Sequence, residues 1–361
     1  MKENPHYKAI GMMSGTSLDG LDIAYCEFWM DGLEDVWHYA LHRAHTFTYP
    51  NDLADKLAAC MRMSGLELTM LDKELGRWFG EKAREFMAEN DLAPDFIASH
   101  GHTVFHQPAK SLTLQIGDGV TMAREAGVEI INDFRSKDVA LGGQGAPLVP
   151  IGDKLLFGEY TACVNLGGIS NISFDDKIGE RLAYDIGPVN IILNRLARQK
   201  GKPYDDDGIM AEGGKCDHSL LKSLNDLPYY REPPPKSLGY EWMEEVVFPL
   251  LDNSGLDTVD QLRTATEHIA STIAVSLKLH DIRDRVLFTG GGTLNTFLMD
   301  EIRRLSGLEV KVTVPNEETV KYKEALVFAF LGVLRKRGEI NCLHSVTGAV
   351  SDSCGGVVHK L

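Results

Sequence analysis

The stretch IGMMSGTSLDGLDIAYCEF, residues 10–28, decides the fold. Small, turn-prone residues at 14–17 interrupt an apolar segment with strand character, and a second such segment begins after Gly20. Glycine lets a ligand approach the backbone closely, and hydroxyl and N–H groups offer hydrogen-bond donors to an anion. Ordinary hairpin turns favour the same residues. By itself, the stretch therefore predicts either a phosphate-binding bend or a structural turn.

Two carboxylates, Asp19 and Asp22, follow this bend. Asp19 would repel a bound phosphate unless a cation lay between them. Mg²⁺ is usually held by one or two carboxylates together with substrate phosphates. The P-loop pattern and the G-x-G-x-x-G fingerprint are both absent from the sequence. If the bend binds phosphates, we therefore expect a nucleotide with Mg²⁺, bound in another way than in those two classes.

Composition limits the class of protein. With 361 residues, 43% of them apolar, the chain is long enough for two or three domains with sizeable cores. The formal net charge of −15 makes nucleic acids and anionic membranes poor partners. Six dispersed cysteines without a C-x-x-C pair favour reduced thiols. No apolar run approaches the roughly 20 residues that span a bilayer. We expect a cytoplasmic globular protein without a nucleic-acid or membrane partner.

The second half of the chain repeats the opening pattern. VNLGGISNIS, residues 164–173, again reads as strand, glycine bend and strand. RVLFTGGGTLN, residues 285–295, has three glycines after a buried strand, which we interpret as close backbone approach to a flat ligand such as a nucleoside. The duplication predicts an α/β protein with two related lobes, each a mixed sheet with helices, and a cleft between them. This plan is similar to that of the actin, hexokinase and Hsp70 ATPases.

Hydrophobic periodicity and turn residues give the expected elements. We expect a helix to begin at Pro188 and to end near Gly201. The glycine- and proline-rich segment 139–150 is expected to cross between the domains. The N-terminal lobe is accordingly expected over 1–136, joined by 340–361, and the C-terminal lobe over 137–339. The other segments expected to be helical are 51–90, 117–127, 261–279, 294–307 and 323–338.

Asp185, in AYDIGPVN, is the candidate acid or base. A carboxylate at the end of a strand faces the region where ligands of α/β sheets bind, and there it can accept the proton of an attacking oxygen. An aspartate just before a helix can equally serve the helix dipole. Arg135 and Asp138 can bind a carboxylate and sugar hydroxyls, or can form a surface ion pair. His100 is expected to line the substrate side, because His100, His102 and the residues around them do not complete a zinc site.

As a set, these motifs closely resemble those of the anhydro-N-acetylmuramic acid kinase family. The resemblance covers nearly the whole chain and rests on MSGTSLDGLDIA, SHGHTVFHQP, LQIGD, DFRSKDVALGGQGAPLVP, NLGGISNIS, YDIGPVN, PPPKSLG, GGGTLN and VTGA. It implies a two-lobed, actin-like (ribonuclease H-like) ATPase fold with ATP between the lobes. The implied reaction uses ATP and water to open the 1,6-anhydro bridge of 1,6-anhydro-N-acetylmuramic acid, a product of peptidoglycan recycling, and to phosphorylate the 6-oxygen.

The resemblance also implies roles for individual residues. Asp185 would be the general base, Asp19 and Glu324 would face Mg²⁺, and a homodimer is implied. The residues expected to bind substrate are His100, Arg135, Asp138 and Asn190. The residues expected to bind ATP are Gly15, Thr16, Ser17, Leu18, Asp19, Gly20, Leu21, Asp22, Gly167, Gly168, Gly290, Gly291, Gly292 and Asn295.

Three positions depart from the family pattern. His102 stands where the family usually has glutamine, Ile186 replaces a common threonine, and Val189 replaces a smaller residue. The departures leave Asp185 and Asn190 in place. A kinase for an ordinary sugar or amino sugar on the same fold remains an alternative, and so does a non-catalytic ATP-driven scaffold.

Overall fold

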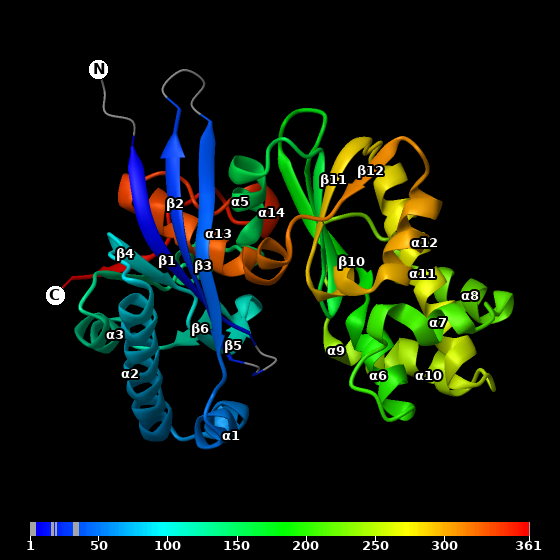
Figure 1. The fold of residues 1–361 in the computed structure, drawn as a ribbon, viewed down its shortest axis with the longest axis horizontal. Helices are drawn as coiled ribbons and strands as arrows, with labels where there is room; N and C mark the ends of the chain where they lie inside the picture. Colours follow the sequence, from blue (N-terminus) through cyan, green and yellow to red (C-terminus); the bar gives the residue numbers. More distant parts are fainter. Residues whose placement is uncertain (1–4, 16–17, 19, 32–35, 361) are drawn as a thin grey trace. The chain divides into compact units, whose positions relative to one another are not determined.

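The computed structural model describes residues 5–15, 18, 20–31 and 36–360 (Figure 1). The chain forms two compact units. Unit 1 comprises Met1–Leu156 and Tyr322–Leu361, and unit 2 comprises Phe157–Lys321.

Unit 1 is built on a six-stranded sheet with the order β13-β7-β4-β1-β2-β3. The pairs β1–β2 and β2–β3 are antiparallel, β1–β4 and β4–β7 are parallel, and β13 closes the edge antiparallel to β7. The two strands expected on either side of the bend at 14–17 are therefore confirmed, and a third antiparallel strand follows them. The strands are β1 (His6–Ser14), β2 (Leu21–Met30), β3 (Trp37–Phe47), β4 (Phe96–Ser99), β7 (Ile130–Asn132) and β13 (Val357–His359).

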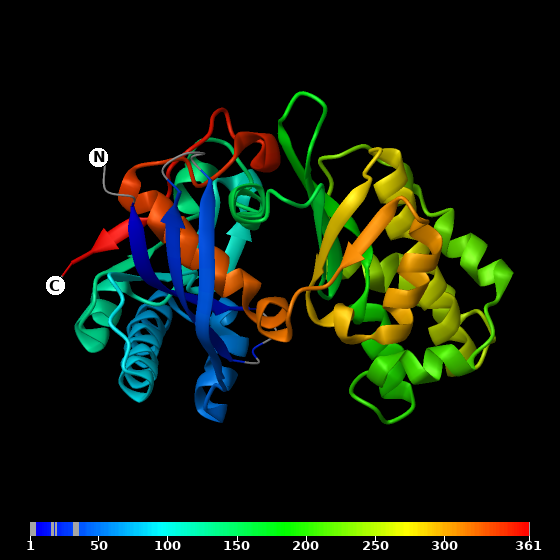
Figure 2. The same cartoon turned by 45° about the horizontal axis from the view of Figure 1, so that its top comes forward.

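Helices cover both faces of this sheet. Alternate residues of β1, Ile10 and Met12, share a core with α1 (Asn51–Ala59), α2 (Gly65–Asn90) and α3 (Gly119–Ala126). On the other face runs α13 (Glu317–Arg337), orange in Figure 2. It crosses β1 so closely that a Cβ at Gly11 would lie 1.7 Å from the carbonyl oxygen of Ala325. Only glycine permits this crossing, which fixes the position of α13 on the sheet.

Unit 2 repeats the plan. Its five-stranded sheet has the order β10-β9-β8-β11-β12, with β8, β9 and β10 antiparallel and with β11 parallel to both β8 and β12. The order and directions match β3-β2-β1-β4-β7 of unit 1, so the duplication expected from the sequence is confirmed. The strands are β8 (Ala162–Leu166), β9 (Ile169–Asp175), β10 (Arg181–Pro188), β11 (Asp284–Thr289) and β12 (Val310–Thr313).

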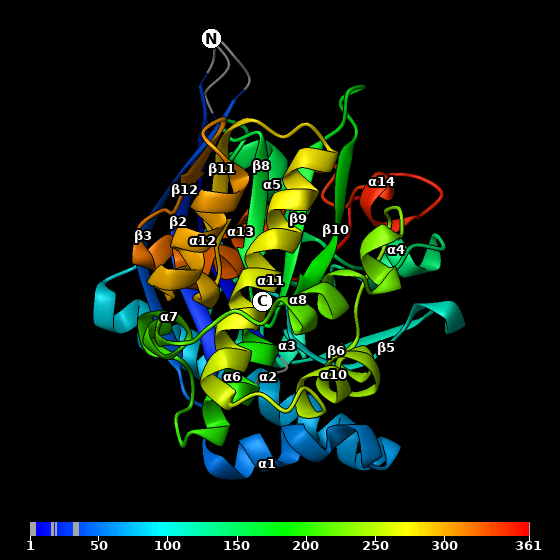
Figure 3. The ribbon, with the colours of Figure 1, turned by 90° about the vertical axis from the view of Figure 1, so that its right-hand side faces the viewer.

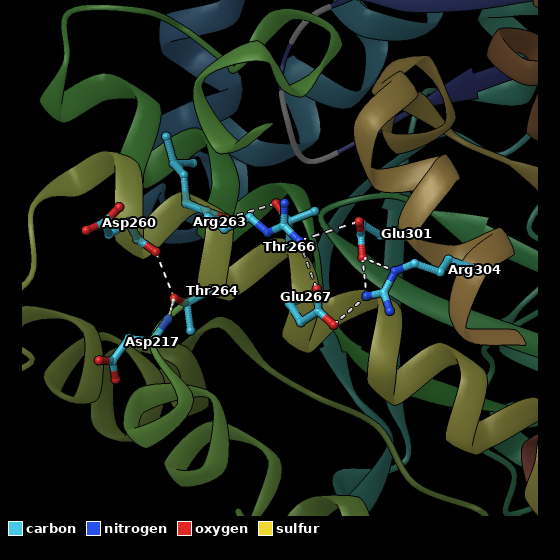
Figure 4. A network of polar contacts seen from close by, with 9 residues as sticks. Asp217, Asp260, Arg263, Thr264, Thr266, Glu267, Glu301 and Arg304 are labelled. Atoms are coloured by element: carbon cyan, nitrogen blue, oxygen red, sulfur yellow. Dashed lines mark hydrogen bonds and ion pairs between the residues drawn. The ribbon is translucent and has the colours of Figure 1, made fainter. Parts of the chain in front are cut away.

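The helices of unit 2 bury the second large core. α11 (Thr258–Leu279) and α12 (Thr296–Ser306) lie against one face of the sheet, as Figure 3 shows. A polar network joins these two helices (Figure 4). Arg304 contacts Glu301 at 2.5 Å and Glu267 at 2.6 Å, and Arg263 contacts Glu267 at 3.3 Å. The network cross-links α11 and α12 at their exposed margin.

Shorter elements complete the chain. Among the described residues, six of them lie in unit 1 up to Leu156, α14 lies in unit 1 near the C-terminus, and the others lie in unit 2. They are η1 (Cys60–Arg62), β5 (His102–Gln107), η2 (Pro108–Lys110), β6 (Leu112–Ile116), α4 (Ser136–Ala140), α5 (Val149–Leu156), α6 (Asn190–Gln199), η3 (Asp206–Gly208), α7 (Ile209–Gly213), α8 (His218–Asn225), η4 (Pro228–Arg231), α9 (Tyr240–Trp242), η5 (Met243–Val247), α10 (Phe248–Asp252), η6 (Gly291–Leu294) and α14 (His344–Thr347). Among the described residues, every helix is too short or too polar to cross a membrane.

The boundaries differ from those expected. The segment 137–156 belongs to unit 1, and the chain returns to unit 1 at Tyr322 rather than at 340. The physical reason is burial, because α13 packs across β1 and because Asp138 is hydrogen-bonded to Thr347 near the C-terminus. The helix expected from Pro188 begins later, at Asn190, since Pro188 still pairs with Ile169 in the sheet.

Candidate active-site residues

Residues at the start of α6 hydrogen-bond to the bend between β8 and β9. The Asn190 amide group donates to the carbonyl oxygens of Leu166 at 3.1 Å and Gly167 at 2.8 Å. The backbone N–H of Val189 donates to the carbonyl oxygen of Gly168 at 2.8 Å. Asn190, expected to bind substrate, therefore supports the glycine bend through its side-chain amide.

The triple glycine after β11 packs directly on this bend. A Cβ at Gly290, whose φ is +85°, would lie 2.5 Å from Oδ1 of Asn165, and one at Gly292 would lie 2.8 Å from Cβ of Leu166. A Cβ at Gly291 would meet nothing within 4 Å. Gly290 and Gly292 are therefore needed for packing within the protein, whereas the sequence had suggested close approach to a ligand for all three glycines. Both are required so that the β11 turn can contact β8, and only Gly291 faces open space.

Asn295 ends this glycine-rich turn and begins α12. Its side-chain oxygen accepts the N–H of Leu298 at 2.9 Å, the usual bond of a helix N-cap. The structure therefore gives Asn295 a local role, and contact with ATP stays a prediction. Unit 2 thus brings Gly167, Gly168, the triple glycine and Asn190 into one cluster.

Asp185 lies on β10, the edge strand of the sheet, next to a bulge at Ile186. One segment of the chain, 229–238, contacts three of its four polar atoms. The N–H of Asp185 donates to the carbonyl oxygen of Lys236 at 3.1 Å, and its carbonyl oxygen accepts the Tyr229 hydroxyl at 2.5 Å. The N–H of Leu238 donates to Oδ2 at 2.9 Å. No group of the described residues donates to Oδ1.

The electrostatics of Asp185 suit a proton acceptor. Burial raises the pKa of this carboxyl above its usual value, and the hydrogen bond from Leu238 opposes that rise. Desolvation destabilises the ionised form, so the carboxylate gains more by taking up a proton than an exposed aspartate does. A half-buried carboxylate with one unengaged oxygen is a group that can serve as a general base.

Arg135 and His100 form a pair in unit 1. His100 is buried, and its Nδ1–H donates to the carbonyl oxygen of Gly101 at 2.8 Å. Its Nε2 is therefore an acceptor, and it receives Nε of Arg135 at 3.1 Å and Nη2 at 2.9 Å. Burial, followed by the Arg135 charge, lowers the pKa of His100 to about 3, so the ring stays neutral. His100 thus orients Arg135 without neutralising it.

The described part of the chain engages three of the five guanidinium N–H groups of Arg135. Of the five guanidinium N–H groups, two donate to His100, and one on Nη1 donates to the carbonyl oxygen of Gly145 at 2.6 Å. The remaining two, one on each terminal nitrogen, meet no acceptor among the residues that the structure describes. A planar guanidinium with two free donors can bind an anionic or strongly polar group bidentately.

Asp138 is buried, with 1% of its surface exposed. Its Oδ2 accepts the N–H of Gly145 at 2.7 Å, and its Oδ1 accepts the Thr347 hydroxyl at 2.8 Å and the Cys342 thiol at 3.2 Å. Both oxygens are occupied within the protein. Asp138 is therefore placed to support the loop whose Gly145 carbonyl group holds Arg135, rather than to face solvent.

The bend between β1 and β2 is only partly described. Thr16, Ser17 and Asp19 lie outside the described residues, so their expected contacts stay predictions. Gly20 has a φ of +152°, and a Cβ there would lie 2.5 Å from the carbonyl oxygen of Phe47. Glycine is therefore required at this position. The neighbouring positions Gly15 and Leu18 are partly exposed, Leu21 is buried, and Oδ1 of Asp22 accepts the Thr46 hydroxyl at 2.6 Å.

Glu324 projects from α13 near Asp22. Its side chain reaches solvent, yet the surrounding protein desolvates it and raises its pKa. The charge of Asp22 adds to this rise, whereas the Arg135 charge opposes it. Beside it, Lys323 is buried and contacts Asp153 at 2.6 Å. A cation relieves a carboxylate whose pKa is raised by a neighbouring carboxylate, and carboxylate oxygens are of the kind that Mg²⁺ prefers.

Among the described residues, no cluster of three histidine, cysteine, aspartate or glutamate side chains could hold a metal ion by itself. His102 instead contacts the Ser14 hydroxyl at 3.1 Å, and Tyr49 donates to the same hydroxyl at 2.6 Å. Any Mg²⁺ here would need oxygens from another source, such as substrate phosphates.

Sequence reasoning missed the partners of these groups. Tyr229, Lys236 and Leu238 hold Asp185, and Gly145 joins Arg135 to Asp138. For the partners of Asp185, the only signal in the sequence was the prolines of PPPKSLG, because prolines favour an extended segment of restricted conformation. No pattern in the sequence connects residue 185 with residue 238.

Two comparisons with known proteins point to the same family. A model of the family described as anhydro-N-acetylmuramic acid kinase matches residues 7–360. The chain is 35% identical, over 370 residues and 97% of each chain, to the anhydro-N-acetylmuramic acid kinase of Vibrio cholerae serotype O1.

Two solved structures show distant likeness. The activator of the 2-hydroxyisocaproyl-CoA dehydratase from Clostridium difficile, with bound ADPNP, is 11% identical with a TM-score of 0.45, covering 91% of this chain and 97% of that chain. Component A of the (R)-2-hydroxyglutaryl-CoA dehydratase of Acidaminococcus fermentans is 13% identical with a TM-score of 0.40, covering 90% and 96%. On the match of the family model and the identity to the Vibrio relative, this chain belongs to the anhydro-N-acetylmuramic acid kinase family.

Proposed function

We propose that this protein uses ATP and water to convert 1,6-anhydro-N-acetylmuramic acid into N-acetylmuramate 6-phosphate and ADP. Membership of the family supports the substrate and the reaction. The single observation in the structure that supports the proposal most strongly is Asp185, a half-buried carboxylate with a raised pKa and one oxygen left without a donor among the described residues.

In the proposed reaction, Oδ1 of Asp185 accepts a proton from a water molecule. The water oxygen then forms a bond to the anomeric carbon, the bond from that carbon to the 6-oxygen breaks, and the 6-oxygen bonds to the γ-phosphorus of ATP. ADP leaves with the electron pair of the broken phosphoanhydride bond. General-base catalysis of this kind contributes about 100- to 10,000-fold to rates.

The glycine-rich elements are proposed to bind the nucleotide. In unit 2, the bend at Gly167 and Gly168 and the open side of Gly291 offer backbone N–H groups to a ligand that can approach closely. In unit 1, the bend that contains Gly15 and Gly20 is proposed to do the same. We also propose ATP-bound Mg²⁺ near Asp19 and Glu324, where the ion would neutralise phosphate charge.

Arg135 is proposed to bind the sugar substrate through its two unengaged N–H groups. His100 and Asp138, expected to touch substrate, are proposed to act through Arg135, because both are buried and fully bonded within the protein. Asn190 is likewise proposed to act through the glycine bend. A homodimer in the cytoplasm remains part of the proposal.

The decisive experiment is a labelled-product assay. The purified protein is incubated with 1,6-anhydro-N-acetylmuramic acid, Mg-ATP and ¹⁸O-labelled water, and the product is analysed by mass spectrometry. The proposal expects one phosphate and one ¹⁸O at the anomeric carbon. N-Acetylmannosamine and N-acetylglucosamine serve as ordinary sugar acceptors in parallel.

Each outcome has a clear meaning. Phosphorylation of the ordinary sugars without turnover of the anhydro sugar would favour the simple kinase. Slow ATP hydrolysis that no sugar accelerates would favour the ATP-driven scaffold. Either result would overturn the proposed reaction while leaving membership of the family untouched.

A further inference from the structure

We propose that the segment Tyr229–Leu238, which we call the Asp185 clasp, positions the general base, and that Lys236 is the positioning residue that keeps the clasp closed. The inference rests on the proposed function, because it takes Asp185 as the base. It assigns a task to the PPPKSLG motif, which the function derived above does not use.

The clasp reaches Asp185 because β10 is an edge strand. On its inner side β10 pairs with β9, whereas its outer side has no neighbouring strand in the sheet. The clasp occupies this side, accepting the Asp185 N–H at the Lys236 carbonyl oxygen and donating the Tyr229 hydroxyl to the Asp185 carbonyl oxygen. The backbone of the base is therefore fixed on both sides of the strand.

The same segment selects the reactive oxygen. The Leu238 N–H binds Oδ2 at 2.9 Å, and no described group binds Oδ1. A carboxylate fixed at its backbone and at one oxygen has little rotational freedom left about its side-chain bonds. Oδ1 is thereby held in one orientation. A general base must first lie within reach of the proton that it accepts, and only then does its pKa determine how well it works.

The side chain of Lys236 links the two ends of the clasp. Its Nζ donates to the carbonyl oxygen of Tyr229 at 2.9 Å, so the two ends of the segment that touch Asp185 are joined by a charge-assisted hydrogen bond. The same ammonium group lies 4.5 Å from the ring centroid of Tyr229 and 5.5 Å from that of Tyr184, the residue before the base. Cation–π contacts of this kind further stabilise the position of the ammonium group when it is partly desolvated.

A second set of contacts anchors the clasp in unit 2. The Tyr230 hydroxyl donates to Nε2 of His268 on α11 at 2.8 Å, and Nδ1–H of His268 donates to Oδ1 of Asn225 at 2.6 Å. Trp242 packs against the rings of Tyr229 and Tyr230, with centroids 5.4 Å and 6.4 Å away. The clasp is therefore fixed to the core at Tyr230 and, through the partly buried side chain of Leu238, at its far end, and the Lys236 ammonium group joins the two ends.

Few charged groups surround the clasp. Burial raises the pKa values of Tyr184, Tyr229 and Tyr230, and lowers those of His268 and His280, so all five are neutral near pH 7. The charged groups of the clasp are Arg231, Glu232 and Lys236, and those described beside it include Asp185 and Asp226, which contacts Arg231 at 3.1 Å. A change in the pH dependence of turnover after a clasp mutation is therefore readily assigned to the base.

The test compares four variants with the wild-type protein in the anhydro-sugar assay. Lys236→Met keeps the length of the side chain but removes the charge and the donor, Lys236→Arg restores both, and Tyr229→Phe removes one hydroxyl. Lys311→Met is the matched control, because Lys311 is exposed on β12, the opposite edge of the same sheet. kcat, both KM values and the pH dependence of kcat are measured for each.

Lys236→Met is expected to lower kcat about 10- to 100-fold, as for a misplaced catalytic group. The KM for each substrate is expected to change less than about threefold, since binding is not the function affected. The acid limb of kcat is expected to move to lower pH, because opening the clasp exposes the Asp185 carboxyl to water and burial is the larger cause of its raised pKa. Lys236→Arg should recover most of the activity, and Lys311→Met should match the wild type.

The proposal is overturned if Lys236→Met keeps a kcat within about twofold of the wild type, or if its acid limb does not move. If Lys236→Met fails to fold, Tyr229→Phe carries the test, with a smaller fall in kcat expected and an unchanged kcat as the contrary result. If the wild-type protein does not turn over the anhydro sugar, the proposed function fails instead. The two failures are thus distinguishable.

Discussion

In each unit, one charged side chain is hydrogen-bonded to the protein through some of its polar atoms, and its other polar atoms have no partner among the described residues. In unit 1 the guanidinium of Arg135 is held by the neutral ring of His100 and the carbonyl oxygen of Gly145. In unit 2 the carboxylate of Asp185 is held by the N–H of Leu238. Neither support carries the opposite full charge, so both groups keep their charge for a ligand or a proton.

The two supports differ in where they come from. Arg135 is held by segments that reach into the core, ending at the buried Asp138 and its partner Thr347. Asp185 is held by a partly exposed segment that lies along the edge of a sheet. We therefore expect changes around Asp185 to cost little stability, and changes to the buried support of Arg135 to destabilise the fold.

The largest effect is expected from Asp185→Asn. The amide keeps the shape but cannot accept the proton, so kcat should fall about 100- to 10,000-fold. Nucleotide affinity, measured by calorimetry, should be nearly unchanged, because Asp185 is not part of the proposed nucleotide site. Asp300→Asn on the exposed surface of α12 is the control. Turnover near the wild-type rate would remove Asp185 from the mechanism.

Arg135→Lys tests the charged side chain of unit 1. Lysine keeps the charge but cannot bind His100 and Gly145 and still present two donors, so kcat/KM for the sugar should fall about 10- to 100-fold. The KM for ATP should change much less. Steady-state kinetics with each substrate varied in turn will show the difference. An equal loss for both substrates would mean that Arg135 is needed for the fold rather than for the sugar.

Asp138→Asn should destabilise unit 1. Its NH₂ group cannot accept, so whichever way the amide turns, either the Gly145 N–H or the Thr347 and Cys342 donors lose their acceptor, and a buried donor left without a partner costs about 1–3 kcal/mol. Urea unfolding followed by fluorescence measures the change. Thr347→Val, which removes one hydroxyl from the same carboxylate, should lose less. Equal stability of Asp138→Asn and the wild type would show that the buried carboxylate is not required.

The smallest effect concerns pH, and it should be similar in the two units. Burial lowers the pKa values of His100 and His268 to about 3, whereas the unfolded chain protonates histidine near 6.5. Unfolding therefore takes up protons between these values. Stability should be constant above pH 6.5 and fall as the pH drops toward 3, by at most about 1.4 kcal/mol per unit for each histidine.

Urea unfolding at pH 7.5, 6.5 and 5.5 checks this dependence. His268→Gln should depend less on pH than the wild type, since one of the two groups no longer titrates. The same slope in both proteins would show that His268 does not stay neutral in the folded state.

Much of the fold follows from local patterns in the sequence. The glycine bends after β1 and β8, the strands around them and the duplication were predictable, because alternation and glycine requirements are properties of neighbouring residues. The helix start near 188 was placed too early, since proline fits both a first helical turn and the edge strand that it actually ends. The domain boundaries were also displaced, because they depend on which segments α13 packs against.

The sequence by itself determined the chemistry that this protein can offer: a carboxylate at 185, an arginine at 135 and glycines at the bends. Only the tertiary structure decided how these groups are held, with His100 and Asp138 behind Arg135 and with Lys236 and Leu238 around Asp185. The physical reason is that a residue type is fixed locally, whereas a hydrogen-bond partner 53 residues away, as Leu238 is from Asp185, is chosen by packing of the whole unit.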